Sequence, residues 1–291
     1  MPLNHEAVGI TTDPVRVDWT TKDTILYALG AGCGVDALQF TTENSKGITL
    51  QTLPSMPVVL ARTPILTMIG DIDWTKLVHA AQHVSLHQPL PPKGSANNVA
   101  TVTGIYDKGK AAIVVTETVG RDAGSGEKLW TSTMHLYIRG AGGWGGEKGP
   151  SLRSEPPQRQ PDASVTVATA ENQALIYRLS GDRNPLHSDP SFARAAGFDR
   201  PILHGLCTFG VSTRAIVETM AEGDAANVVS IAGSFAAPVF PGDPLTVDMW
   251  RTDEDSLTFR TRVKDTEVIT GGTCQFASGE LRPRTSRKEP G

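Results

Sequence analysis

The amino-acid sequence predicts an α+β protein made of two similar halves, each with a helical start followed by an antiparallel meander of strands. Three observations lead to this prediction. Runs of β-branched and aromatic residues, broken by polar or glycine-containing turns, occupy residues 98–140 and 226–278. A helix signal precedes each run. A stretch dense in Gly, Pro and charged residues, 140–164, separates the two halves.

Length and composition fit a globular protein with a sizeable core. The chain has 291 residues, of which 39% are apolar and 20% are charged, as in soluble domains. Its formal net charge of -4 provides no overall attraction to phosphate backbones or anionic lipids. We therefore expect neither nucleic acid nor a membrane surface as a partner.

The cysteines and apolar stretches indicate a reducing compartment. Cys33, Cys207 and Cys274 are odd in number and scattered, which suits neither a disulfide framework nor a metal site. No stretch approaches the roughly 18 apolar residues of a spanning helix, and the first residues lack a signal-peptide pattern. We expect a cytoplasmic protein.

In the first half, Thr20 is expected to cap a short helix that ends near Gly30, with Asp23 in its first turn. Prolines then break up residues 54–64. We interpret residues 77–94 as the end of a helix that leads into a strand. Strands of the meander are expected at 98–109, 110–120 and 128–140.

The Gly- and Pro-rich stretch marks the domain boundary, because it has no periodicity of its own. We place a first domain at residues 1–148, a linker at 149–163 and a second domain at 164–291.

Two short helices are expected after the linker. Thr169 is placed to cap a helix at 171–181, and Asp189 with Pro190 to start another that ends at Gly197.

A longer helix is expected at 205–220, with apolar residues roughly on one side. Strands follow at 226–239, 244–252, 256–264 and 267–278.

A polar cluster in the second half is the strongest candidate for chemistry. Asp182, Asn184 and His187 lie within six positions, next to Gly181 and Pro185. Glycine and the Asn-Pro step favour a rigid loop, on which a carboxylate and a neutral imidazole can share one water. This suits addition of water across a polarised double bond. The alternative is a turn without chemistry, because these residue types are strong turn formers.

The two halves align when one is shifted by 150 positions. Tyr27 then falls on Tyr177, and the three polar positions fall on Gly32, Gly34 and Ala37. If this match reflects a duplicated domain, the first copy has lost every polar group of the cluster.

The helix expected from Gly205 offers backbone N–H groups at its positive end. A thioester carbonyl placed there gains negative charge as its enolate forms, and fixed donors stabilise that charge most in the transition state. The alternative for Gly205 is ordinary helix capping. His204 is interpreted as a packed histidine, or as one that supports a catalytic residue, rather than as a catalyst itself.

Two motifs carry a family resemblance. Tyr-x-x-x-Gly-Asp-x-Asn-Pro-Leu-His at 177–187 and Pro-Ile-Leu-His-Gly-Leu-Cys-Thr at 201–208 resemble the signature of the (R)-specific enoyl-CoA hydratases, in the MaoC-like dehydratase family. YALGAG, HAAQHVSLHQPLP, IYDKG and LYIRGAGGWGG look like the degenerate N-terminal domain of its double hotdog members.

The resemblance implies a double hotdog fold, in which two antiparallel sheets each wrap a central helix and join edge to edge. It also implies reversible hydration of a trans-2-enoyl-CoA to the (3R)-3-hydroxyacyl-CoA, with no metal or other cofactor. By the same resemblance, Asp182 and His187 are the catalytic pair that holds the water. Asn184 orients the water or the thioester, and the Gly205 amide is the oxyanion donor.

The resemblance also places His79, Lys108 and Phe235 at positions that line the acyl-CoA site. An ammonium such as that of Lys108 suits a CoA phosphate, although a solvated turn lysine and a core phenylalanine are the ordinary alternatives. This chain has His79-Ala80 where relatives have His-Gly, so the first-half contact departs from the family pattern.

Two rival functions stay open at the level of sequence: a hotdog acyl-CoA thioesterase and a non-catalytic acyl-thioester binding protein. Acyl chain length and branching, the direction of the reaction and the choice between CoA and acyl carrier protein also stay open. Exposed sheet edges and family habit lead us to expect a homodimer.

Overall fold

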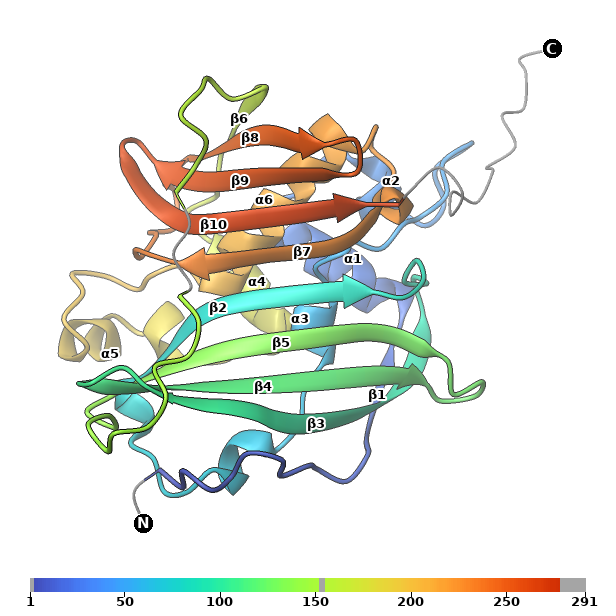
Figure 1. Ribbon diagram of the computed structural model, residues 1–291. Helices are drawn as coiled ribbons and strands as arrows, with labels where there is room; N and C mark the ends of the chain where they lie inside the picture. Colours follow the sequence, from blue (N-terminus) through green and yellow to red (C-terminus); the bar gives the residue numbers. More distant parts are fainter. Residues whose placement is uncertain (1–2, 152–154, 278–291) are drawn as a thin grey trace.

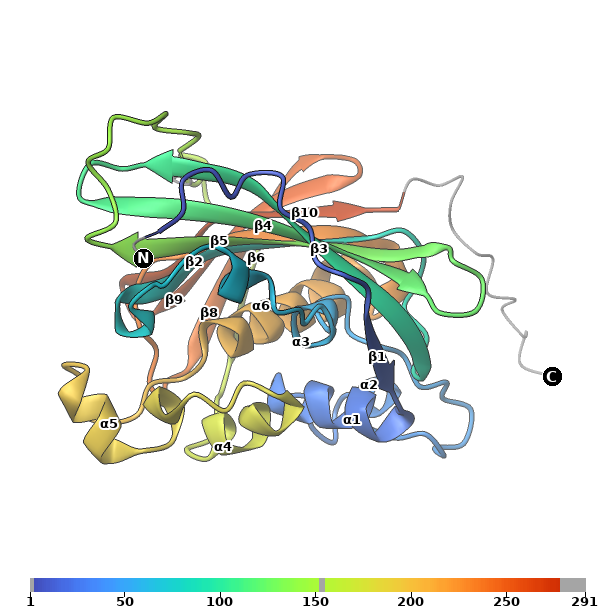
Figure 2. The ribbon, with the colours of Figure 1, turned by 90° about the horizontal axis from the view of Figure 1, so that it is seen from below.

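The computed structural model describes residues 3–151 and 155–277. Ten strands form one antiparallel sheet in the order β1-β3-β4-β5-β2-β7-β10-β9-β8-β6, and helices cover one of its faces (Figures 1 and 2). The strands are β1 (Val15–Trp19), β2 (Leu77–Leu86), β3 (Gly94–Asp107), β4 (Ala111–Asp122), β5 (Lys128–Arg139), β6 (Ala163–Val167), β7 (Val228–Phe235), β8 (Leu245–Asp253), β9 (Ser256–Val263) and β10 (Thr266–Phe276).

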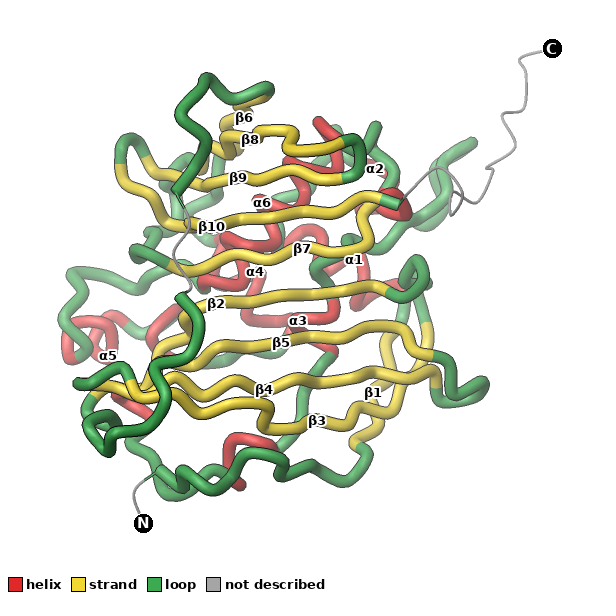
Figure 3. The backbone as a smooth tube through the Cα atoms, viewed as in Figure 1, coloured by secondary structure: helices red, strands yellow, loops and turns green. Residues whose placement is uncertain are grey.

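Most of the helices, drawn in red, lie behind the strands in the view of Figure 3. The α-helices are α1 (Thr21–Gly30), α2 (Leu38–Thr41), α3 (Pro57–Leu60), α4 (Gln173–Tyr177), α5 (Pro190–Ala195) and α6 (Gly205–Met220). The 3-10 turns are η1 (Ile65–Met68), η2 (Trp74–Lys76), η3 (Arg178–Ser180), η4 (Pro185–His187) and η5 (Ala225–Asn227). None of the helices in the described part of the chain has the length and hydropathy of a membrane-spanning segment.

The sheet consists of two half-sheets with the same connectivity. From the centre outward, the first half runs β2-β5-β4-β3-β1 and the second runs β7-β10-β9-β8-β6. Each strand of one half therefore has its counterpart, in chain order, at the same place in the other. The halves join by pairing of β2 with β7, from Ala81 opposite Ser234 to Ser85 opposite Ser230. The predicted α+β fold, with two antiparallel half-sheets joined edge to edge, is confirmed.

The helices form two layers on the covered face. Figure 2 shows α6 and α3 next to the sheet, with α1, α4 and α5 farther out. Every residue of α6 from Cys207 to Val217 is buried. The sequence predicted burial on roughly one side of this helix only. Burial extends around the helix because the sheet covers one side and the outer helices cover the other. In the first half, α3 has only four residues, since Pro57 opens it and Pro64 follows closely.

Several local signals act as the sequence predicts. The Thr20 side chain accepts a hydrogen bond from the Asp23 amide, and the Asp23 side chain accepts one from the Thr20 amide, which completes a capping box at α1. The Asp189 carboxylate accepts from two amides at the start of α5. Gly197, with φ of 89°, lies just beyond the end of α5.

Other local predictions are wrong. Residues 77–86 are strand throughout, because β2 is hydrogen-bonded to β5 on one side and to β7 on the other. Thr169 does not cap the next helix: its hydroxyl donates to the Asp243 carbonyl, and α4 begins only at Gln173. The short edge strands β1 and β6 were not foreseen.

The two halves also interlock through their first helices. The Gln173 amide donates to the carbonyls of Leu29 (3.0 Å) and Gly30 (2.8 Å), across the boundary between α4 and α1. The rings of Tyr27 and Tyr177 pack with centroids 6.0 Å apart, and both side chains are fully buried. This contact fixes the end of α4, from which the polar cluster follows.

Candidate active site

The polar cluster lies on a tight loop between α4 and α5. Gly181 has φ of 128°, a region that residues with a Cβ rarely adopt. Asp182 Oδ1 accepts from the Asn184 amide (3.1 Å), and Asn184 Oδ1 accepts from the Leu186 amide (3.0 Å). Asp182 and Asn184 therefore do form the turn that was the alternative interpretation of this cluster. It still leaves Asp182 Oδ2 without a recorded partner in the described part of the chain.

His187 is held as a neutral base. Its Nδ1–H donates to the Ile202 carbonyl (2.9 Å), which leaves Nε2 with an open lone pair. The side chain is buried, and burial lowers its pKa because the cation is disfavoured away from water. The bond to Ile202 and the charge of Asp182 oppose this shift without cancelling it. At neutral pH the ring is therefore ready to accept a proton at Nε2.

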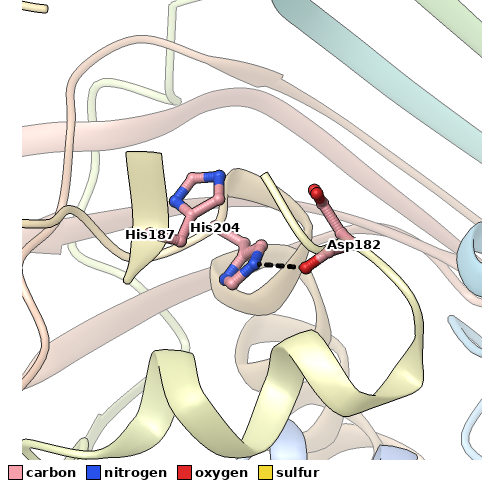
Figure 4. A group of neighbouring side chains, drawn as sticks. All are labelled: Asp182, His187 and His204. Carbon is pink, nitrogen blue, oxygen red and sulfur yellow. Dashed lines mark hydrogen bonds between the residues drawn. The ribbon is translucent and has the colours of Figure 1, made fainter. Parts of the chain in front are cut away.

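His204 connects the two ends of the cluster (Figure 4). Its Nε2–H donates to the main-chain carbonyl of Asp182 (3.1 Å), and its ring stacks on His187 with centroids 3.7 Å apart and planes 27° apart. Burial, and next the neighbouring His187, lower the pKa of His204 to about 4. The sequence interpretation of a packed histidine agrees with its burial. The bond to Asp182 joins residues 22 positions apart and had no local sequence signal.

A single water can join Asp182 and His187. Asp182, His187 and His204 each present one nitrogen or oxygen, and these atoms lie within 4.8 Å of one another. Two hydrogen bonds of about 2.8 Å span up to about 5.6 Å. A water can therefore bridge one carboxylate oxygen of Asp182 and one ring nitrogen of His187 at ordinary hydrogen-bond lengths.

The same three groups are weak candidates for a metal site. The bonds to Ile202 and Asp182 leave His187 Nε2 and His204 Nδ1 as the open nitrogens. The lone pairs of imidazoles lie in the ring planes, and these two planes are stacked 3.7 Å apart. Such lone pairs run side by side rather than converge on one ion, so the cluster is better suited to handling protons.

The start of α6 completes the site. Gly205 is exposed, and its N–H has no recorded acceptor among the described residues, while the His204 side chain makes no cap bond. The Phe235 ring packs against it, since a Cβ on Gly205 would lie 3.2 Å from that ring. The glycine therefore lets a ligand approach N–H groups at a helix N-terminus.

The first half contributes His79. Its ring meets Phe235 edge to face with centroids 5.1 Å apart, and its Nε2–H donates to the Ala81 carbonyl (3.0 Å). Burial lowers the pKa of His79 to about 4, against an opposing effect of the nearby Asp182 charge. His79, Phe235 and Gly205 thus lie beside Asp182 and His187, at the junction of the two halves.

Lys108 is placed differently. Its ammonium donates to the carbonyls of Lys148 and Pro150, in the crossover that follows β5. The adjacent Asp107 carboxylate accepts from the amides of Gly109, Gly143 and Gly145 in the same region. These contacts tie the β3–β4 turn to the crossover, and none of them joins Lys108 to Asp182 or His187. Its part in phosphate binding stays a prediction.

Family models match both halves of the chain. The MaoC like domain matches residues 153–272, and the MFE-2 hydratase 2 N-terminal domain matches residues 18–140. A protein of Mycobacterium tuberculosis named 3-hydroxyacyl-thioester dehydratase Y is 44% identical over 290 residues, which cover 96% of this chain and all of that protein. The chain belongs to the MaoC-like dehydratase family.

Other members agree. The peroxisomal enoyl-CoA hydratase 2 of Arabidopsis thaliana is 40% identical over 270 residues, covering 86% of this chain and 87% of that protein. The crystal structure of a MaoC-like dehydratase from Phytophthora capsici matches with a TM-score of 0.86 and 30% identity, over 96% of this chain and all of that one.

The fold comparison extends to distant structures. A Mycobacterium tuberculosis protein described as having a double hotdog fold matches 93% of this chain and 96% of that one, with a TM-score of 0.56 and 12% identity. The predicted double hotdog fold of this MaoC-like dehydratase is confirmed.

The histidine assignments can be tested by nitrogen NMR across a pH titration. At pH 7 we expect His187 as the neutral Nδ1–H tautomer and His204 as the neutral Nε2–H tautomer. As pH falls, His187 should take up its proton below the ordinary value of 6.5, and His204 near pH 4. Because burial disfavours the cation, any activity that needs the base should be lost only below that ordinary value. A His187 that titrates at or above 6.5 would contradict the assignment.

Proposed function

We propose that this MaoC-like dehydratase is an (R)-specific enoyl-CoA hydratase, a hydro-lyase. It adds water reversibly to a trans-2-enoyl-CoA to give the (3R)-3-hydroxyacyl-CoA, and in reverse it is a 3-hydroxyacyl-thioester dehydratase. The observation that carries this proposal is the pair of Asp182 and neutral His187, separated by a distance that one water spans. The names of its relatives, enoyl-CoA hydratase 2 and 3-hydroxyacyl-thioester dehydratase, describe the same chemistry.

In the hydration direction, His187 Nε2 acts as the base. It accepts one proton from the bound water as the water oxygen forms its bond to C3 of the substrate. The Asp182 carboxylate accepts a hydrogen bond from the other hydrogen of that water and so orients it. The proton then passes from His187 to C2 on the same face, which restores the neutral base. No proton is gained or lost overall.

The negative charge that develops on the thioester oxygen is stabilised at the start of α6. As the C3–O bond forms, the π electrons of the double bond move onto this oxygen and give an enolate. The Gly205 N–H, at the positive end of a 16-residue helix, is placed to donate to it. Removal of one such donor typically costs about a hundredfold or more in kcat.

The remaining site residues receive supporting roles. Asn184 caps η4 through its Oδ1, and we assign its amide nitrogen to orienting the water or the thioester. His79 and Phe235 line the acyl-CoA site beside Gly205. Lys108 contacts a CoA phosphate in this proposal, in exchange for one of its carbonyl partners.

The two domains divide the work. Residues 1–148 form the domain that binds the acyl-CoA, and residues 164–291 form the catalytic domain. Residues 149–163 are the linker between them. The four-residue α3 leaves less helix under the first half-sheet than α6 provides under the second. This reduction favours a long or bulky acyl tail in the first half.

Partners and location follow from the same proposal. The thioester is a substrate, and the mechanism uses no metal or other cofactor. The three cysteines are buried and free, in keeping with a reducing cytoplasm, although several relatives are named as peroxisomal. The edge strands β1 and β6 offer backbone groups through which two copies of the chain could pair as a homodimer. The enzyme acts in fatty acid metabolism in this proposal.

The reaction separates this hydratase from the rival thioesterase. With crotonyl-CoA, we expect the absorbance of the enoyl group to disappear without release of free thiol, because water adds to C3 and the thioester survives. Both signals can be followed in one cuvette with a thiol reagent. Thiol that appears in step with substrate loss supports the hydrolase, and no change in either signal supports a non-catalytic binder.

Substitution of the catalytic pair tests the mechanism. Asp182→Asn and His187→Ala should each lower kcat about a hundredfold or more, since general acid–base groups contribute on that scale. Asp189→Asn is the matched control, because this neighbouring carboxylate only caps α5. It should stay within about threefold of the unchanged enzyme, because asparagine caps a helix about as well as aspartate does. Full activity of either Asp182→Asn or His187→Ala would contradict the mechanism.

A further inference from the structure

Two arginines at nearly equivalent places each reach into the opposite half. Arg62 follows α3, and Arg214 lies in α6, 152 positions later. The Arg62 guanidinium donates to the Ser180 carbonyl, and the Arg214 guanidinium donates to the Gly32 carbonyl. Both acceptors belong to the loop that follows the first helix of the other half. The double hotdog therefore contains a reciprocal pair of arginine contacts.

Arg214 is a structural member of this pair. Its side chain is 7% exposed and forms ion pairs with Asp36 (3.0 Å) and Glu218 (2.8 Å). The loop that it holds carries Gly32 and Ala37 where the other half has Asp182 and His187. No catalytic group depends on it.

Arg62 differs from Arg214 in its exposure and in its partners. Its Nε–H donates to the Val59 carbonyl (2.8 Å) at the end of α3, which fixes the base of the guanidinium in the first half. The residue is exposed, and none of the carboxylates in the described ranges forms an ion pair with it. Within the described ranges, its one hydrogen bond to the second half goes to the Ser180 carbonyl.

The loop is shaped to receive this guanidinium. Any Cβ on Gly181 would overlap the Arg62 guanidinium, and the φ of 128° already disfavours a side chain there. Ser180 and Gly181 directly precede Asp182. The next carbonyl along, that of Asp182 itself, accepts from His204 (3.1 Å). The main chain of the catalytic aspartate is thus anchored on both sides.

We propose that Arg62 is a positioning residue for catalysis: it reaches from the first half and holds the Ser180–Gly181 main chain so that the Asp182 carboxylate meets the water. This inference rests on the proposed hydratase function. A displacement of about 1 Å at a reacting group can cost about a hundredfold in rate. The first half therefore contributes to turnover as well as to binding.

The test compares Arg62→Ala with the unchanged full-length enzyme on crotonyl-CoA and on crotonyl-pantetheine, which lacks the CoA phosphates. We expect kcat to fall about 10- to 100-fold on both substrates, because a misplaced Asp182 affects the chemical step whatever the carrier. KM should stay within about threefold. Added guanidinium ion at millimolar concentration should restore part of kcat, since it can refill the position of the lost group.

The matched control is Arg214→Ala, which removes the equivalent contact from the loop without catalytic groups. It should lower the melting temperature while kcat of the folded fraction stays within about threefold, as expected where only folding stability is affected. If that variant does not fold, Asp36→Ala loosens the same contact more mildly, because the Asp36 side chain is 71% exposed.

The outcomes separate this inference from the proposed function. If the unchanged enzyme does not hydrate crotonyl-CoA, the proposed function fails. If it does and Arg62→Ala is fully active, the positioning role fails. A rise in KM confined to crotonyl-CoA would overturn it in favour of a phosphate contact, and a loss of kcat that guanidinium does not restore would overturn it in favour of a purely structural role.

Discussion

The pairing of β2 with β7 is the interaction on which the rest of the structure depends. It joins two half-sheets into one, and it ends at Ala81 and Ser234. Directly beyond this end, β2 carries His79 after a break in its register with β5, and β7 ends at Phe235. The two side chains meet edge to face there. The edge pairing therefore brings one residue from each half to the start of α6, where Gly205 lies.

The two halves of this MaoC-like dehydratase have loops of the same kind, and only one of them carries Asp182 and His187, to which we assign the chemistry. The loop of the first half is closed by a buried, fully paired Arg214. The loop of the second half carries Asp182 and His187 and is held by Arg62 and His204 through main-chain carbonyls. Main-chain anchors leave the side chains of the pair available for water. In our proposal, the repeated loop serves stability in the first half and catalysis in the second.

Much of the fold could be predicted from local sequence, because its signals act over a few residues. The capping box at Thr20, the cap at Asp189 and the strands of both meanders depend on neighbouring side chains and on patterns of β-branched residues. The beginning of β2 could not be predicted in this way. Its strand conformation comes from hydrogen bonds to β5 and β7, the second of which lies about 150 residues away in the chain.

The candidate site shows the same division. Asp182, Asn184, His187 and Gly205 lie in two compact motifs and were found from sequence. The bond from His187 to Ile202 and the stacking of His187 on His204 need the folded chain. Arg62 had no sequence signal at all, since its partner, the Ser180 carbonyl, is 118 positions away.

In the proposed mechanism, the residues of one loop add the hydroxyl group to C3 and the proton to C2 from the same face of the double bond. Hydration of a trans-2-enoyl-CoA in D₂O tests this most directly, with the relative configuration at C2 and C3 of the product read by proton NMR. We expect syn addition, with deuterium at C2 and oxygen at C3 on the same face, and the (3R) configuration. Anti addition, or a mixture of configurations at C2 in product that has not re-equilibrated, would contradict it.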